Sequence, residues 1–219
     1  PVSVTYPFPK KELESAVRMP DNRIALELIR AADLPVSAPS ANKSGRPSPT
    51  DAQTVRGDLG SAVAQVLDGG ETKIGVESTV IDVTGSSPVL LRAGGLPKEK
   101  IEEALGLKVL LPQDKNVIKR SPGTRYRHYA PKLPLLPAKA ENAEKTAQGR
   151  KYAWMGTSEI SGSPVKKLIF KSEEEYAHEV FRALRKLEKS GAEIIIAEIP
   201  SEKGIGLAIK DRLNRAAGN

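Results

Sequence analysis

A proline-rich, basic stretch in the middle of this chain constrains its fold more than any other feature of the sequence. The segment from Leu111 to Pro137 contains five prolines and little hydrophobic periodicity. Proline lacks the amide hydrogen that helices and sheet ladders need, so the segment predicts an extended linker. A chain of 219 residues is long enough for two small domains. We therefore expect a first domain over residues 1–111, a linker over 112–137 and a second domain over 138–219.

Before the linker, helical and extended patterns alternate. Apolar residues recur at helical spacing in Asn22–Ala32, with Asp21 as the expected N-cap. A second helix is expected to end at Leu59, with Thr50 as its cap and Gln53 completing a capping-box pattern. β-branched or apolar runs predict strands at 34–38, 63–68, 79–83 and 89–92, and a further helix is expected at 97–105. Because some connections are too short for a helical crossover, we expect an α/β domain with a mixed sheet.

Beyond the linker the same alternation continues on a smaller scale. Strands are expected at 151–155, 165–170 and 194–198, and helices at 172–189 and 205–217. These segments predict a small Rossmann-like α/β domain. Its residues show no cluster typical of a catalytic site.

The composition excludes several kinds of chemistry. Cysteine is absent, which excludes disulfides, thiolate metal sites and a cysteine nucleophile and is consistent with an intracellular protein. Pro1–Pro9 lacks a signal-peptide pattern, and no apolar run approaches the roughly 20 residues of a membrane helix. We therefore expect a cytoplasmic protein with no membrane partner. The two histidines, His128 and His178, form no metal-ligand cluster, so a metal would be magnesium held by the phosphates of a nucleotide.

The positive charge is concentrated locally. The formal net charge is +7, and Lys115–Lys132 holds six cations and no acid. Such a cluster suits a polyanion, either the phosphates of a nucleotide or a nucleic acid backbone. A basic, solvated linker explains the charge equally well.

Three motifs of the first domain carry groups that can bind a ligand. The loop Pro39–Thr50 offers hydroxyls, an amide side chain and backbone amides before a helix, which suits phosphate and adenine, although an ordinary proline-rich turn has a similar composition. Ser78 comes shortly after Gly75 at the start of a strand, where its hydroxyl could face a ligand. Hydroxyls at such positions more often bond to local backbone groups than to a ligand. Arg92 precedes two glycines that permit close backbone approach, so it suits a phosphate or is a surface arginine.

The linker itself carries a motif of alternating cations and aromatic residues, Arg125–Pro131. This alternation suits stacking on a base together with pairing to phosphate. Alternatively, the tyrosines attach the linker to a domain surface.

Taken in order, six short motifs resemble the threonylcarbamoyl-AMP synthase family in its long, two-domain form. They are Val17–Pro20, Ala38–Gly45, Asp68–Gly70, Gly75–Val80, Leu91–Gly95 and Ser121–Pro131. The resemblance runs from Val17 to the C-terminus and includes the tail Gly204–Leu213. It implies a YrdC-like twisted mixed sheet with helices, then the linker folding over a cavity, then the Rossmann-like domain.

The resemblance also implies a reaction. ATP, L-threonine and bicarbonate bind with magnesium, and the carboxylated amine of threonine attacks the α-phosphate to give threonylcarbamoyl-AMP and pyrophosphate. A partner transferase then moves the threonylcarbamoyl group to an adenosine of tRNA. No covalent enzyme nucleophile is needed, so no residue is assigned a catalytic role.

Site residues follow from the same resemblance. Arg18 would hold the threonine carboxylate, with Ala38 and Ser78 as further threonine contacts. The residues that resemble ATP contacts are Ser40, Asn42, Ser48, Arg92 and Tyr129. Tyr129, on the linker, would also help to exclude water from a labile carbamate.

The sequence departs from the family at its beginning. The family's Lys-Arg-x-x-x-Lys-Pro-Leu motif, which cradles the triphosphate, has no counterpart, and Glu14 stands where the family usually has threonine. A chain that truly begins at Pro1 is expected to have little or no synthase activity. The competing hypotheses are an inactive fragment, a YrdC-like carbamoyltransferase and a basic RNA-binding module. The linker motif argues against the carbamoyltransferase.

Overall fold

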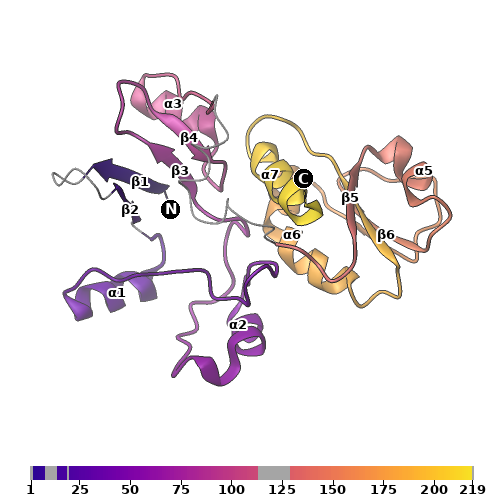
Figure 1. The fold of residues 1–219 in the computed structure, drawn as a ribbon, viewed down its shortest axis with the longest axis horizontal. Helices are drawn as coiled ribbons and strands as arrows, with labels where there is room; N and C mark the ends of the chain where they lie inside the picture. Colours follow the sequence, from indigo (N-terminus) through magenta and orange to yellow (C-terminus); the bar gives the residue numbers. More distant parts are fainter. Residues whose placement is uncertain (1, 8–13, 19, 113–128, 219) are drawn as a thin grey trace.

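Two four-stranded sheets organise the chain (Figure 1). The computed structural model describes residues 2–7, 14–18, 20–112 and 129–218. We call the part up to residue 112 the first unit and the part from residue 129 the second unit. The expected α/β class, with a mixed sheet followed by a Rossmann-like unit, is confirmed.

The sheet of the first unit has the strand order β2-β1-β3-β4. Its strands are β1 (Val2–Pro7), β2 (Glu14–Arg18), β3 (Thr79–Asp82) and β4 (Val89–Arg92). β1 pairs antiparallel with β2 and parallel with β3, and β3 pairs antiparallel with β4, so the sheet is mixed. The helices are α1 (Arg23–Ala32), α2 (Ala52–Leu59) and α3 (Lys98–Leu105), with a 3-10 turn at Gly60–Ala62.

The helix starts of the first unit differ by one residue from the sequence expectation. Asn22, not Asp21, caps α1 and accepts a hydrogen bond from the Ala25 amide at 3.0 Å. Asp51, not Thr50, caps α2 and accepts from the Thr54 amide at 2.7 Å. In both cases the side-chain oxygen sits three residues before the amide it satisfies, which is the geometry an N-cap requires.

Two predicted strands of the first unit, 34–38 and 63–68, are wrong. Both segments are apolar, but neither pairs with another strand in the described part of the chain. Leu34 is 69% exposed and Leu67 is 51% exposed. An apolar run becomes a strand only where a partner satisfies its backbone, and the described residues provide none for these segments.

The sheet of the second unit is entirely parallel, with the order β5-β8-β6-β7. Its strands are β5 (Leu135–Ala138), β6 (Tyr152–Gly156), β7 (Lys166–Ile169) and β8 (Ile194–Glu198). Its helices are α5 (Ala143–Ala147), α6 (Glu173–Leu187) and α7 (Gly206–Ala217), with a 3-10 turn at Ala140–Asn142. The three predicted strands and two predicted helices of this part are confirmed within a residue or two.

Strand β5 lies at the end of the predicted linker and pairs with β8. Proline cannot donate to a sheet ladder, but Pro137 lies on an edge strand, where that loss is tolerated. The central strands β6 and β8 are covered on both faces, which explains their continuous apolar sequence. Helices α6 and α7 lie on the side of this sheet that faces the first unit (Figure 1).

No helix among the described residues is both long enough and apolar enough to cross a membrane.

Candidate ligand site between the two units

A carboxylate at the entry to β3 connects the two units. Glu77 accepts a hydrogen bond from the Ser48 hydroxyl at 2.6 Å and from the Arg212 Nε at 2.6 Å. Ser48 belongs to the loop before α2, whereas Arg212 projects from α7 of the second unit. The side chain of Arg212 is only 1% exposed and that of Glu77 is 19% exposed. We call these three residues the Glu77 network.

Both charged members of the network are ionised. Burial opposes the charge of Glu77, but the Arg212 charge and the Ser48 hydroxyl lower the pKa of Glu77 below its usual value. Burial likewise opposes the charge of Arg212, but the carboxylates of Glu77 and Asp211 raise the pKa of Arg212 further above its usual range. The charges therefore persist across physiological pH.

Arg92 lies beside this network at the end of β4. It is buried, and its Nε and Nη2 donate to the Ser78 carbonyl at 3.2 and 2.9 Å. Burial and the charge of Arg212 lower the pKa of Arg92, and the charge of Arg18 acts in the same direction. Arg92 thus lies within electrostatic reach of two further guanidinium groups, those of Arg212 and Arg18, and of the Glu77 carboxylate. That excess of positive charge suits an anionic ligand.

Tyr129 lies where the described chain resumes after residue 128. Its backbone adopts a left-handed conformation with φ of 66°, and its side chain is 5% exposed. The ring stacks on Phe181 of α6 at 5.1 Å between centroids, and the Arg212 guanidinium lies 5.4 Å from the ring centroid. Burial, followed by the Glu77 charge, raises the pKa of Tyr129 to about 12. The tyrosine therefore stays neutral and anchored to the second unit.

The loop before α2 is held close to Tyr129. The Ala130 amide donates to the Gly45 carbonyl at 2.8 Å. Within the loop, the Asn42 amide group donates to the carbonyls of Lys43 and Arg46 at 2.9 and 3.2 Å. Its buried Oδ1 has no hydrogen-bond partner in the described part of the chain. An acceptor in this position suits a ligand donor such as an amino group.

The structure brings together most of the site residues expected from the sequence, but not all. Ser48, Ser78, Arg92 and Tyr129 gather around Glu77, and Arg18 is within electrostatic reach of Arg92. Ala38, just before the loop Pro39–Thr50, and Ser40, near its start, are exposed. The linker residues Arg125, Arg127 and His128 lie outside the described residues, and the roles of all these residues as ligand contacts stay predictions.

Sequence reasoning missed the acid and the arginine that join the units. Glu77 stands inside a motif that was recognised, Gly75–Val80, but only its hydroxyls were considered. Arg212 lies in the tail segment Gly204–Leu213 directly after Lys210 and Asp211, where a further charged residue gives no sign that it is buried. Only the packing of α7 against the first unit reveals its role.

Two glycines allow the backbone around the site to pack closely. A Cβ on Gly94 would come within 2.3 Å of the Glu77 carbonyl oxygen and the Thr79 amide nitrogen. A Cβ on Gly75, whose φ is 84°, would come within 2.2 Å of the His178 carbonyl oxygen on α6. Glycine is therefore required where β4 leaves the site and where the first unit meets α6.

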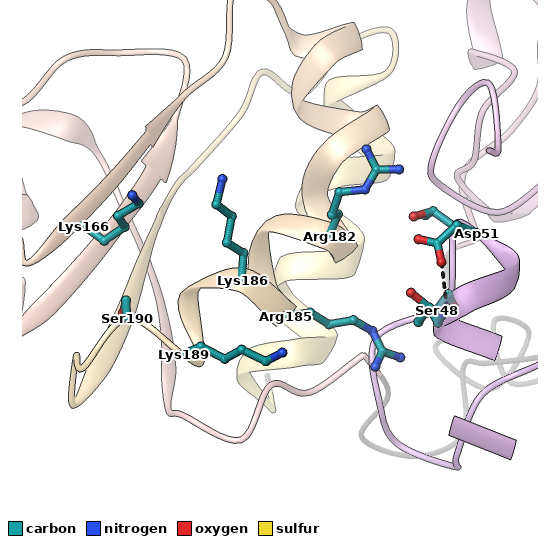
Figure 2. A pocket seen from close by; sticks show the side chains of 10 residues that line it. Ser48, Asp51, Lys166, Arg182, Arg185, Lys186, Lys189 and Ser190 are labelled. Carbon is teal, nitrogen blue, oxygen red and sulfur yellow. Dashed lines mark hydrogen bonds between the residues drawn. The ribbon is translucent and has the colours of Figure 1, made fainter. Parts of the chain in front are cut away.

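A recess of about 620 Å³ adjoins the network on the α6 side (Figure 2). Ser48 and Asp51 line it from the first unit, and five cations line it from the second unit: Lys166, Arg182, Arg185, Lys186 and Lys189. Both arginines are paired with acids, Arg185 with Asp58 at 2.6 Å and Arg182 with Glu71 at 3.1 Å. The three lysines Lys166, Lys186 and Lys189 have no acidic partner in the described part of the chain, so the recess keeps a positive charge.

The described residues contain no group of three histidine or acidic side chains that could hold a metal ion.

The fold and the site define a class: a two-unit α/β protein with an arginine-rich site at the junction of its units. Residues 7–94 match a family model described as telomere recombination, and residues 96–218 match the model of the threonylcarbamoyl-AMP synthase C-terminal domain. The chain belongs to the threonylcarbamoyl-AMP synthase family, as its sequence motifs suggested.

Individual relatives agree with this assignment. The chain is 42% identical over 217 residues to a threonylcarbamoyl-AMP synthase of Pyrococcus abyssi, covering 93% of this chain and 64% of the relative. It is also 42% identical over 219 residues to the synthase of Bacillus subtilis, covering 93% and 63%. A crystal structure of Pyrococcus abyssi Sua5 complexed with L-threonine matches with a TM-score of 0.86 and 36% identity, covering 99% of this chain and 70% of that one. The chain thus spans slightly under two thirds of the length of these curated relatives.

Proposed function

We propose that this chain forms threonylcarbamoyl-AMP and pyrophosphate from L-threonine, bicarbonate and ATP. The observation that carries the proposal is the pair of Arg92 and Arg212 beside Glu77, with Ser48 and Ser78 in hydrogen-bond contact and Arg18 within electrostatic reach of Arg92. Threonine brings a carboxylate to such a site and ATP brings a triphosphate, so both substrates are anions that guanidinium groups bind well. The related Pyrococcus abyssi Sua5 was crystallised with L-threonine.

The residues would divide the binding of the two substrates. Arg18, exposed at the end of β2, would hold the threonine carboxylate, with Ala38 and Ser78 as further contacts. Arg92 would neutralise charge at the phosphates. The remaining proposed ATP contacts are Ser40, Asn42, Ser48 and Tyr129.

The proposed chemistry balances without an enzyme nucleophile. The threonine amine adds to carbon dioxide derived from bicarbonate and loses a proton, which gives a carbamate. A carbamate oxygen attacks the α-phosphorus of ATP, and the bond to the β-phosphate oxygen breaks to release pyrophosphate. The residues position the carbamate and offset charge at the phosphates, whereas magnesium would arrive on the ATP phosphates. Tyr129, buried and neutral at the junction, would limit access of water to the carbamate.

The product sets the proposed partners. Threonylcarbamoyl-AMP is a mixed anhydride, so a transferase that carries the group to a tRNA adenosine would consume it. A cytoplasmic location follows from that role. We retain 1–111, 112–137 and 138–219 as the proposed division into domains.

An RNA-binding module is the second candidate. Lys166, Lys186 and Lys189 have no acidic partner in the described part of the chain, and they line the same recess. Binding through these lysines would weaken steeply with salt and would not require threonine.

Threonine-dependent pyrophosphate release tests the proposal. The chain is incubated with ATP, bicarbonate and magnesium, with and without threonine, and pyrophosphate is measured. Arg18→Met is expected to raise the KM for threonine by about tenfold or more, because it removes a charge-assisted carboxylate contact. Arg23→Met, an exposed arginine on α1, is the matched control and should leave the KM unchanged. Pyrophosphate release that ignores threonine, or equal effects of the two substitutions, would refute the proposal.

A further inference from the structure

Arg212 is a buried cation on an otherwise apolar helix face. Its neighbours on the buried side of α7 are Ala208, Ile209, Leu213 and Ala216, which pack in the core of the second unit. Replacing a buried ion pair by apolar residues is often neutral or stabilising, so stability alone does not account for an arginine here. The side chain also leaves its own unit, because its longest-range partners belong to the first unit.

The guanidinium of Arg212 makes three different polar contacts. Its Nε donates to Glu77 at 2.6 Å, its Nη2 donates to the Ala93 carbonyl at 3.0 Å, and its Nη1 pairs with Asp211. Glu77 in turn accepts a hydrogen bond from the Ser48 hydroxyl at 2.6 Å, so Arg212 restrains Ser48 through Glu77. Its bond to Ala93 restrains the backbone directly after Arg92. One side chain of the second unit therefore fixes the surroundings of two proposed ATP contacts.

The same guanidinium also fixes Tyr129. It lies 5.4 Å from the ring centroid, and the ring also stacks on Phe181 at 5.1 Å. Contact with a cation and with an aromatic ring restrains the tyrosine more than either contact alone. A third proposed ATP contact is thus held by Arg212.

In the second unit, a side chain of the chain itself takes up hydrogen-bond donors at the ends of the strands. Open parallel sheets bind ligands at the carboxyl ends of their strands. Here the Glu198 carboxylate, at the end of β8, accepts hydrogen bonds from the Ser158 amide at 2.9 Å and the Thr157 hydroxyl at 3.1 Å, and from the Thr157 amide. The chain's own carboxylate thus occupies donors that a ligand anion would use.

We infer that Arg212 is a positioning residue for the ATP-binding part of the site, and that through it the second unit completes a site carried by the first. The inference rests on the proposed function. Arg212 acts through Glu77 on Ser48, through Ala93 on the end of β4, and directly on Tyr129. The planar fork of arginine supplies these contacts together, which the single ammonium group of lysine cannot do.

Steady-state kinetics of pyrophosphate release by the chain test the inference, with Arg212→Met, Arg212→Lys and Glu77→Gln. Arg212→Met is expected to raise the KM for ATP by about tenfold or more and to leave the KM for threonine nearly unchanged, because small misplacements of binding groups are costly. Arg212→Lys should recover only part of that loss. The double variant Arg212→Met/Glu77→Gln should be no worse than the poorer single variant, because both act through one contact.

Arg150→Met is the matched control, since the Nε of Arg150 donates to the Ala147 carbonyl at 3.2 Å within the second unit and Arg150 makes no bond to the first unit among the described residues. It should leave the KM for ATP within twofold. The inference is overturned if both Arg212 variants keep the unaltered KM, if Arg150→Met raises it equally, or if the effects of Arg212→Met and Glu77→Gln multiply. If Arg212→Met does not fold, Arg212→Lys and Glu77→Gln still decide the matter. An unaltered chain without threonine-dependent release instead contradicts the proposed function itself.

Discussion

The two units of the molecule differ in how they are stabilised. In the second unit every residue of β6 is buried, and α6 buries seven side chains. In the first unit α1 has no buried residue, and Leu28 on that helix is 49% exposed. The second unit is thus a packed scaffold, whereas the first unit has a smaller core, formed by Ile81, Leu90, Ile101 and Val109.

Polar contacts join the units at several places, beside the apolar packing of Val76 and Ala93 in the core of the second unit. Arg46 pairs with Glu188 at 2.7 Å, and Arg185 pairs with Asp58 at 2.6 Å. Together with Arg212, these pairs hold the loop before α2 and the entry to β3 against α6 and α7. Polar contacts specify orientation better than apolar ones, which suits a junction where the proposed site must be held in one geometry.

The largest expected effect comes from breaking the scaffold. Phe181→Ala removes a fully buried ring and the stacking partner of Tyr129, and should lower the free energy of unfolding by about 4 kcal/mol. Trp154, the only tryptophan, is buried in the second unit and reports its unfolding in urea by fluorescence. A loss below about 1 kcal/mol would show that the second unit is not the packed scaffold described above.

The next largest effect separates the two units. Gly75→Ala places a Cβ in a left-handed backbone position and 2.2 Å from a carbonyl oxygen of α6, so a loss of about 3 kcal/mol is expected. The loss should appear in circular dichroism, with a smaller shift in the Trp154 transition. Gly57→Ala, in α2 with open space around it, is the control and should be neutral or stabilising. Equal shifts of both probes would mean that the units unfold as one.

The sequence predicted regular elements better than it predicted the junction. The expectations for β3, β4, α3 and the elements of the second unit from β6 onward came from local apolar patterns, which act over a few residues and can be read directly. The sequence predicts that Gly94 permits a close approach of the backbone. The group that approaches Gly94 is the backbone around Ser78 and not a ligand. The partnership of Glu77 with Arg212 joins residues 135 positions apart, so no local pattern could reveal it.

Acid should weaken the junction. Hydrogen bonds from Arg185 lower the pKa of Asp58, although burial acts to raise it. Burial also acts to raise the pKa of Glu188, but hydrogen bonds from Arg46 and the Lys132 amide outweigh it and lower that pKa as well. Carboxylates with lowered pKa stabilise the folded state above their unfolded pKa, near 4, and that contribution is lost as pH falls through the lowered folded pKa. About 2 kcal/mol should therefore be lost below about pH 4.

Urea unfolding followed by circular dichroism at a series of pH values measures this loss. Arg185→Met removes the main cause of the lowered Asp58 pKa and should make the pH dependence shallower. Arg30→Met is the control, because Arg30 and Glu27 form an exposed pair at 68% and 61% exposure that adds little to stability. A pH dependence unchanged by Arg185→Met would assign the acid sensitivity to groups away from the junction.

The smallest expected effect comes from the apolar surface of the first unit. Leu28→Ala on α1 should change the free energy of unfolding by less than about 0.5 kcal/mol, because a half-exposed leucine gives up little buried area. Ile196→Ala in β8 is the matched core substitution, since that side chain is fully buried, and it should cost about 3 kcal/mol in the same urea titration. A Leu28→Ala loss that approaches the Ile196→Ala loss would mean that α1 is packed in solution. The two units would then bury their apolar side chains to a similar extent and differ only in their topology.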